Sequence, residues 1–393
     1  MNTPIYLDYN ATTPLLPEVV EAMLPYLRDH FGNPSSDHPY GRRAARAVEQ
    51  ARQAVANLLG SEPTEVVFTS GGTEASNMAI LGGFGRRKGR DEIVSTVFEH
   101  PATARPCTIL EDRGARVHRL KGYEEGRIRS KDAEGIIGEK PAVVTVMHAN
   151  NETGVIQPIS ELGALARKAG AFMHTDAAQS LGKIPVNVVD LRVDLLTVAG
   201  HKLYAPKGIG ALYIRNGVQL DGVLHGAGHE NGRRPGTENV ASIVGLGTAC
   251  RIAASDLNRV AAQVRQRRDE LWQRLAASIP GILINGHPTD RLPNTLNVRF
   301  PNVSGLAILA AAPQIAASTG SACHAGQESA SSVILDLGSS EREALGSVRL
   351  SLGRETSQDE VERAANALIQ AWRQVVPAAP KARLPTANST LSG

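Results

Sequence analysis

The chain has 393 residues, of which 42% are hydrophobic and 21% are charged, and its formal net charge is +3. This is ordinary globular composition, and the length favours two domains over one core. With 42 Lys and Arg against 39 Asp and Glu, the balance gives no reason to expect binding to nucleic acid or an anionic membrane. Three cysteines without a C-x-x-C pair argue against a disulfide framework and a structural metal site.

The N-terminal stretch MNTPIYLDYNATTP lacks the basic and apolar regions of a secretory leader. No apolar run is expected to approach membrane-spanning length. We therefore expect a protein of the reducing cytoplasm.

Helical and strand-like patterns alternate along the first two-thirds of the chain. Residues 40–60 predict a helix with one apolar face, ended by Gly60. The runs that follow are rich in Val, Ile and Leu with little polar alternation, which is typical of strands covered on both faces. The predicted strands are 65–70, 92–97, 142–149, 171–178, 193–200 and 209–215. Strands alternating with helices predict an α/β fold with a parallel or mixed sheet.

The pattern changes after about residue 255. Two long amphipathic helices, at about 256–279 and 357–375, bracket the strand-like stretches GILING, NTLNVRF and SVRLSLG. These predict a smaller α+β layer. We expect a large domain at 16–255, a small domain formed by 1–15 and 256–376, and a disordered Pro/Ala/Ser-rich tail at 377–393.

Three strand ends carry candidate chemistry. Lys202, in TVAGHKLYAPKGIGALYI, follows an apolar strand, and a lysine in a partly dry site has the lowered pKa that suits Schiff-base formation. Asp176 ends the strand of HTDAAQ, where burial requires a cationic partner such as a protonated pyridine nitrogen. A solvated loop lysine and an N-cap or surface aspartate remain the alternatives.

The third strand end is TSGGTE, where Gly71 and Gly72 allow a close turn and Thr73 lies at the start of a helix. Free N–H groups and a hydroxyl there make a phosphate site. Neither G-x-G-x-x-G after a strand nor a P-loop is present. Ligands of doubly wound sheets bind at the carboxyl ends of the strands, so the three elements together match the phosphate, ring nitrogen and aldehyde of pyridoxal phosphate.

From residue 6 to residue 356 the chain resembles the cysteine desulfurase and selenocysteine lyase family, in the class V aminotransferase group of fold-type I pyridoxal-phosphate enzymes. The matching stretches are YLDYNATTP, FGNPSS, FTSGGTEASN, EHPA, ANNETGVIQPI, HTDAAQSLGK, GHKLYAPKGIGALYIR, RPGTEN, LPNTLN, GSACHAG and VRLSLGR. The resemblance implies a large domain with a mostly parallel seven-stranded sheet flanked by helices, and a smaller α+β domain.

The resemblance also implies roles for individual residues. Lys202 is similar to the family's Schiff-base lysine, Asp176 to the partner of the ring nitrogen, and Gln179 to the donor to the phenolic oxygen. His100 is similar to a histidine that stacks on the ring and also handles protons, and Gly72, Thr73 and His201 are similar to phosphate ligands. Asn151 is similar to a residue near the phenolic oxygen and substrate, and Arg349 to the arginine that holds the substrate carboxylate. Thr237 is similar to a residue that reaches the partner subunit's phosphate. The last match implies a homodimer.

Cys323, in STGSACHAG, lies among Gly, Ser and Ala, whereas Cys107 and Cys250 have the neighbours of core cysteines. The resemblance implies that Cys323 attacks the sulfur of bound L-cysteine, becomes a persulfide and releases alanine. The sulfur then passes to an acceptor protein such as an iron–sulfur scaffold or a sulfur carrier.

Two positions depart from the family pattern. Ala199 stands where many desulfurases have a hydroxyl group, and His324 beside Cys323 is similar to selenocysteine lyases. A selenocysteine lyase is therefore the main alternative. Transamination, a cofactor-free scaffold and a dehydrogenase are weaker ones.

Overall fold

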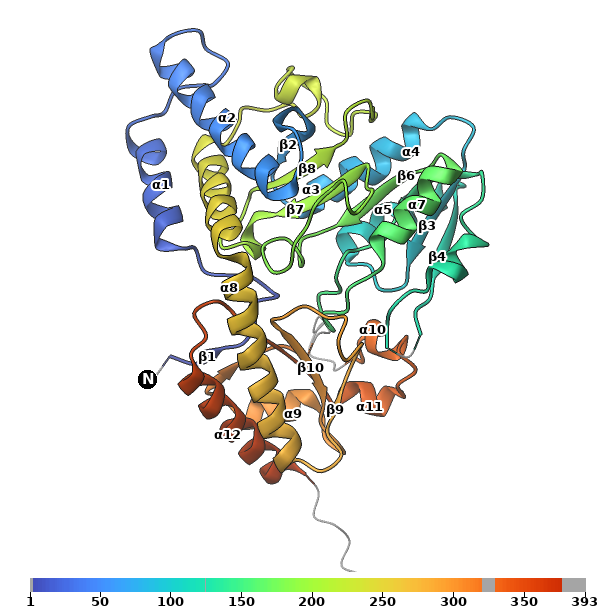
Figure 1. The fold of residues 1–393 in the computed structure, drawn as a ribbon, viewed down its shortest axis with the longest axis vertical. Coiled ribbons are helices and arrows are strands. Elements are labelled where there is room, and N and C mark those ends of the chain that lie inside the picture. Colours follow the sequence, from blue (N-terminus) through green and yellow to red (C-terminus); the bar gives the residue numbers. More distant parts are fainter. Residues whose placement is uncertain (1–2, 124, 320–328, 377–393) are drawn as a thin grey trace, which may run out of the picture.

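The computed structural model describes residues 3–123, 125–319 and 329–376. Cys323, His324 and the tail 377–393 lie outside the described residues. The fold consists of a large α/β part, a small α+β part and a long helix that runs through both (Figure 1).

The large part is built on a seven-stranded sheet in the described chain, with the order β2-β8-β7-β6-β5-β3-β4. The strands are β2 Val66–Thr69, β3 Glu92–Thr96, β4 Arg116–Leu120, β5 Pro141–Thr145, β6 Phe172–Asp176, β7 Leu195–Ala199 and β8 Gly210–Ile214. Only β8 runs antiparallel to its neighbours, so the expected mostly parallel sheet is confirmed.

Helices cover this sheet, as the alternating pattern predicted. They are α1 Pro17–Arg28, α2 Pro39–Leu59, α3 Gly72–Asn77, α4 Gly83–Arg86, α5 Pro101–Asp112, α6 Ser130–Glu134 and α7 Ile159–Ala169. A π-helical turn, η2 Met78–Gly82, joins α3 to α4, and short 3₁₀ turns lie at η1 Pro63–Glu65, η3 Gly200–Lys202 and η4 Glu230–Gly232. Gly60 ends α2 with a φ of 67°, the left-handed conformation that glycine adopts without cost.

The small part contains two further sheets. Strands β12 Ser347–Ser351, β10 Thr295–Arg299 and β9 Leu283–Ile284 pair antiparallel in that order, and β1 Ile5–Tyr6 pairs parallel with β11 Ile315–Ala316. The helices are α9 Gly305–Ala311, α10 Ser332–Leu335, α11 Glu341–Leu345 and α12 Gln358–Val375. The N-terminal strand therefore belongs with the last third of the chain (Figure 1).

Helix α8, Val240–Ser278, connects the two parts (Figure 1). Ile243, Leu246 and Cys250 on its first half belong to the core beside the large sheet, whereas Leu271 and Leu275 on its second half belong to the core of the small part. These separate cores support a domain boundary within α8, which we retain as a proposal.

Two expectations about this helix were wrong. It starts at Val240 and not near residue 256, because VASIVGLGTACRIAAS is buried on several sides and shows no single apolar stripe. By length and composition alone, α8 would also be long and apolar enough to cross a membrane, contrary to our expectation for the whole chain. Half of its most apolar window is buried in the protein, and Ile243, Leu246 and Cys250 in this part of the helix belong to the core beside the large sheet.

Candidate functional site

A cavity of about 410 Å³ lies at the carboxyl ends of β2, β6 and β7. Every predicted site residue except Thr237 and Cys323 lines this cavity. Those that do are Gly72, Thr73, His100, Asn151, Asp176, Gln179, His201, Lys202 and Arg349. Among the described residues, no group of three His, Cys, Asp or Glu side chains is arranged to hold a metal ion.

Asp176 is the last residue of β6 and is 7% exposed. Its Oδ1 accepts a hydrogen bond from the backbone N–H of Ala178 at 2.9 Å. Burial raises the pKa of Asp176, although this N–H and the charges of His100 and Lys202 oppose the rise. A carboxylate in this position is stabilised by any cationic group that enters the cavity.

Lys202 follows β7 in the turn η3, which carries its side chain from the sheet edge into the cavity. Burial and the positive charge of Arg349 lower the pKa of Lys202 to about 8, against the opposing influence of Asp176 and Asp8. Its amine donates to the backbone carbonyls of Asn10 and, at 2.7 Å, Ala11. At neutral pH a useful fraction of this amine is therefore uncharged, as an imine-forming group requires.

His100 caps α5, and its Nδ1 accepts from the backbone N–H of Ala102 at 3.1 Å. This bond leaves Nε2 as the protonated nitrogen of the neutral ring. Desolvation lowers the pKa of His100, with Asp176 opposing and Lys202 adding to that shift, although the residue keeps an exposed surface in the open cavity. The ring is thus a neutral, flat wall of the cavity that can donate one proton.

The turn between β2 and α3, where the sequence predicts a phosphate site, lines the cavity through Gly72 and Thr73. Gly71 adopts a φ of 153°, in a region that other residues rarely occupy. A Cβ on Gly72 would lie 3.2 Å from the Cβ of Ala199, so glycine allows the turn to pack closely on β7. The first N–H groups of the helical segment that starts here have no intrahelical acceptor, and the Thr73 side chain joins them.

His201 and Ala199 complete this wall. Burial, with the charges of Lys202 and Lys207, lowers the pKa of His201 to about 4, so its ring is neutral. Its Nδ1 lies 3.2 Å from the Thr12 hydroxyl. Ala199 lines the cavity with a methyl group, so this position offers no hydroxyl contact.

Arg349 on β12 extends from the small part to the opposite wall. Its Nη2 contacts Asp8 Oδ1 at 2.7 Å, and Nη1 donates to the backbone carbonyl of Asn151 at 3.1 Å. Its Nε is buried without a partner among the described residues. A guanidinium held in this way suits a carboxylate ligand.

Thr237 does not reach this cavity. It lines a separate cavity of about 170 Å³ together with Ser70 and Arg234. Arg234 pairs with Glu74 of α3, with an Nε to Oε1 distance of 2.8 Å, so the segment containing Thr237 is attached near the glycine turn. Cys323 lies outside the described residues.

Asn10 is a site residue that the sequence analysis missed. Its backbone carbonyl accepts from Lys202 and, at 3.0 Å, from Gln179 Nε2. Its side-chain nitrogen donates to Thr295 Oγ1 at 2.9 Å, and its backbone N–H donates to Ser351 Oγ at 2.9 Å. The only sequence signal was its position in YLDYNATTP, which carried the resemblance but no assigned role.

A seven-stranded sheet with a lysine, an aspartate and a helix start at one edge defines the class of this protein. The aminotransferase class-V family model matches residues 5–364, and the chain belongs to this family of enzymes. A solved structure titled NifS-like protein superposes with a TM-score of 0.89 at 32% identity, covering 95% of this chain and 100% of that one. Another, titled SspA in complex with cysteine, gives a TM-score of 0.80 at 36% identity over 88% and 98% of the two chains.

Curated relatives define the branch of the family more closely. A cysteine desulfurase of Trichormus azollae is 44% identical, covering 91% of this chain and 90% of its own length. Cysteine desulfurase NifS of Azotobacter vinelandii is 42% identical with the same coverage of both chains. Cysteine desulfurase IscS of Methanosarcina thermophila is 42% identical, covering 97% of this chain and 95% of its own. The resemblance inferred from the motifs is thereby confirmed.

Proposed function

We propose that this chain is a pyridoxal-phosphate-dependent cysteine desulfurase that converts L-cysteine to L-alanine and carries the removed sulfur on Cys323. The observation that carries the proposal is the convergence of Lys202, Asp176, His100 and Arg349 on one cavity at the edge of the sheet. In a class V aminotransferase these groups match an aldehyde, a ring nitrogen, a ring face and a substrate carboxylate.

The residues present fit the cofactor. Asp176 would face a protonated ring nitrogen, Lys202 would bind the aldehyde carbon, and the turn at Gly72 and Thr73 would hold the phosphate, without a hydroxyl from Ala199. The bound cofactor supplies an electron sink that makes the substrate Cα–H and Cβ–S bonds breakable.

The protein's own groups then have separate tasks. Arg349 holds the substrate carboxylate, which fixes the orientation of Cα. The Lys202 amine, with its pKa of about 8, accepts the α-proton and can return it. The Cys323 thiolate attacks the substrate sulfur, so that an S–S bond forms and the Cβ–S bond breaks. The bond's electron pair stays with the carbon skeleton, which is protonated and leaves as alanine.

The other two cysteines are unsuited to this attack. Burial raises the pKa of both Cys107 and Cys250 to about 12, and their exposed fractions are 1% and 0%. Their thiolate fractions at neutral pH are therefore on the order of 10⁻⁵, against a few per cent for an ordinary thiol. With three cysteines in the chain, Cys323 is the candidate that remains. The two buried free thiols also suit a reducing cytoplasm.

Trapping of the persulfide tests the carrier role. The holoenzyme is mixed with L-cysteine, digested without reductant and examined by mass spectrometry for one added sulfur on the peptide containing Cys323. Cys250→Ala should retain the modification, whereas Lys202→Ala should lose it. Steady alanine release from wild type with an unmodified Cys323 peptide would exclude the carrier role.

Selenocysteine lyase activity is the alternative, because His324 resembles the residue of those enzymes at this position. Turnover of both amino acids by wild type and Cys323→Ala separates the two activities. A desulfurase loses cysteine turnover in the variant, whereas selenium release without a need for Cys323 would favour the lyase.

We also propose a homodimer. Leu27 and Phe31 are large apolar side chains with exposed fractions of 64% and 79%, and Thr237 lies away from its own chain's cavity. If Thr237 serves the partner's site, mixing Lys202→Ala with Thr237→Ala subunits creates one wild-type site in each mixed dimer. Activity should then exceed that of either variant alone, whereas a Thr237 that acts within its own chain gives no such gain.

An acceptor protein, such as an iron–sulfur scaffold or a sulfur carrier, completes the turnover by removing the sulfane sulfur.

A further inference from the structure

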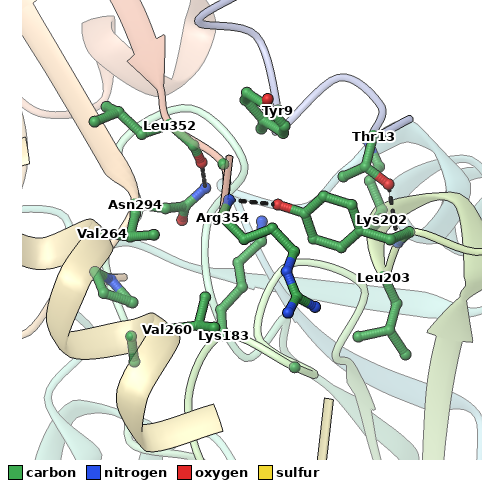
Figure 2. A pocket seen from close by; sticks show the side chains of 15 residues that line it. Tyr9, Thr13, Lys183, Lys202, Leu203, Val260, Val264, Asn294, Leu352 and Arg354 are labelled. Atoms are coloured by element: carbon green, nitrogen blue, oxygen red, sulfur yellow. Dashed lines mark hydrogen bonds between the residues drawn. The ribbon is translucent and has the colours of Figure 1, made fainter. Parts of the chain in front are cut away.

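Lys183 lies next to the catalytic cavity but does not line it, and it has no role in the mechanism above. It lines a small second cavity of about 40 Å³ that shares Lys202 with the larger one (Figure 2). Its neighbours there come from both parts of the protein and include Val260 of α8, Asn294 and Arg354. Such a position would be expected for an apolar side chain rather than an amine.

The amine of Lys183 is held by two neutral oxygens. It donates to Gln179 Oε1 at 2.8 Å and to Asn10 Oδ1 at 3.0 Å. Among the described residues it makes no ion pair. Burial, together with the positive charges of Lys202 and Arg349, holds the pKa of Lys183 well below its usual value. The amine thus directs one N–H group at each of these two acceptors.

The contact with Gln179 fixes which end of that amide is the oxygen. An amide can present either its oxygen or its nitrogen to a neighbour, and the neighbouring groups decide which one it presents. The Lys183 amine acts as the donor in both of its contacts, so it selects Oε1. The Asn10 carbonyl can only accept, so it selects Nε2, which donates to it at 3.0 Å. The second N–H of Nε2 has no other acceptor among the described residues, and Gln179 lines the catalytic cavity.

We propose that Lys183 is a positioning residue for this site. Together with Asn10 it holds the Gln179 amide with its oxygen toward Lys183, so that the free N–H is the group this residue offers to the cavity. The inference rests on the proposed function, because the group that receives this N–H is the phenolic oxygen of the bound cofactor. Lys183 touches neither substrate nor cofactor and acts through Gln179.

Asn10 makes this arrangement rigid. Its side-chain oxygen accepts from Asn294 Nδ2 at 3.0 Å as well as from Lys183, and its carbonyl also accepts from Lys202. Loss of the Lys183 amine leaves Gln179 Oε1 buried without a donor, while Asn10 keeps its contact with Asn294. The effect of such a loss should therefore be concentrated on Gln179.

The test is a spectroscopic titration of the cofactor-loaded protein. A donor to the phenolic oxygen stabilises the deprotonated form of the bound chromophore, so Lys183→Met should move the pH midpoint of its visible band upward by roughly 0.7 units, the equivalent of one hydrogen bond. Lys168→Met, the same change at an exposed lysine of α7, should leave the midpoint unchanged. If Lys183→Met does not fold, Lys183→Ala replaces it, because it removes the donor without added bulk.

A double-mutant cycle distinguishes positioning from a general structural effect. In a Gln179→Leu background, Lys183→Met should produce no additional shift, because the group through which it acts is absent. Additive shifts, or a wild-type midpoint in Lys183→Met, would overturn the inference. A wild-type protein without any visible cofactor band would instead contradict the proposed function, so the two failures are distinguishable.

Discussion

Glu99, which precedes His100, is a carboxyl group enclosed by the protein. It is 9% exposed, its Oε1 accepts from the backbone N–H of Met147 at 2.8 Å, and its Oε2 has no partner among the described residues. Burial raises the pKa of Glu99 to about 8, and the negative charge of Asp176 adds to this rise against the hydrogen bond from Met147. Glu99 therefore carries a proton at neutral pH.

The raised pKa predicts how stability depends on pH. Between the ordinary value of 4.5 and about 8 the folded protein keeps the Glu99 proton, whereas the unfolded chain loses it. The free energy of unfolding should thus fall as pH rises through this window, by a few kcal/mol as an order of magnitude. Urea titrations across the window should show a flatter profile for Glu99→Gln. Glu134→Gln, at an exposed position of α6, should keep the wild-type slope, and an unchanged slope in Glu99→Gln would contradict the assignment.

Loss of the Asp176 carboxylate should affect the stability of the cofactor-free protein and the binding of the cofactor in different directions. Asp176→Asn replaces a buried carboxylate with a neutral amide, so the cofactor-free protein should unfold at the same or a higher denaturant concentration. The cofactor should bind roughly 10- to 100-fold more weakly, because a charge-assisted hydrogen bond is lost. Equilibrium dialysis and denaturation measure the two effects separately. Equal losses in both would indicate a purely structural aspartate.

The site was predictable where one short stretch carries the chemistry. Lys202, Asp176 and Thr73 each follow a strand, and the rule that parallel strands end at one edge brings them together. Asn10, by contrast, contacts Thr295 and Ser351, which are far from it in the chain. Such a contact depends on the packing of the two domains, and no local pattern in the sequence reports it.

At the scale of elements, the C-terminal end of α2 shows how one residue defines a boundary. Gly60 has a φ of 67°, and its N–H bonds back to the carbonyls of Ala56 and Asn57. A Cβ at this position would collide with the side chain of Asn187. Gly60→Ala should therefore lower the free energy of unfolding by about 1–2 kcal/mol.

Gly135 is the matched control for this substitution. It ends α6 with an ordinary φ of −73°, and a Cβ there would meet open space. Gly135→Ala should be neutral or stabilising by less than about 1 kcal/mol, because it reduces the freedom of the unfolded chain. Equal losses in both variants, measured by urea denaturation, would contradict the importance of the left-handed conformation at Gly60.

Elements were predictable where burial is uniform or clearly one-sided. The interior strands of the sheet and helix α2 gave such patterns, and all of them are present. Strand β4 was missed because it lies at the sheet edge and reads RVHRL, which is mostly polar and partly exposed. The first half of α8 was missed for the opposite reason, since burial on several sides removes the periodic stripe.

At the scale of the whole molecule, α8 mechanically links the two cores. Its exposed central residue Ala254 lies between Cys250, in the core beside the large sheet, and Val264, in the core of the small part. Because α8 contributes buried side chains to both cores, unfolding of one core should disrupt the helix and so destabilise the other, which makes their unfolding cooperative.

Ala254→Pro tests this cooperativity. Proline in a helix interior costs about 3 kcal/mol or more and kinks the axis, so we expect two calorimetric transitions in place of one. Ala254→Gly, which costs about 1 kcal/mol without a kink, should lower the single transition and leave it intact. A single transition in the proline variant would show that the interface between the two parts, and not α8, couples them.

The contacts of Asn10 also have a consequence for biosynthesis. This residue is among the first to leave the ribosome. Its backbone N–H can bond to Ser351, and its side chain to Asn294 and Thr295, only after those later residues have been synthesised. The large sheet can assemble on the nascent chain, but the wall behind Lys202 closes only when nearly all of the polypeptide has been synthesised. Under the proposed function, binding of the cofactor is therefore a late event, and chains interrupted before residue 351 should be colourless.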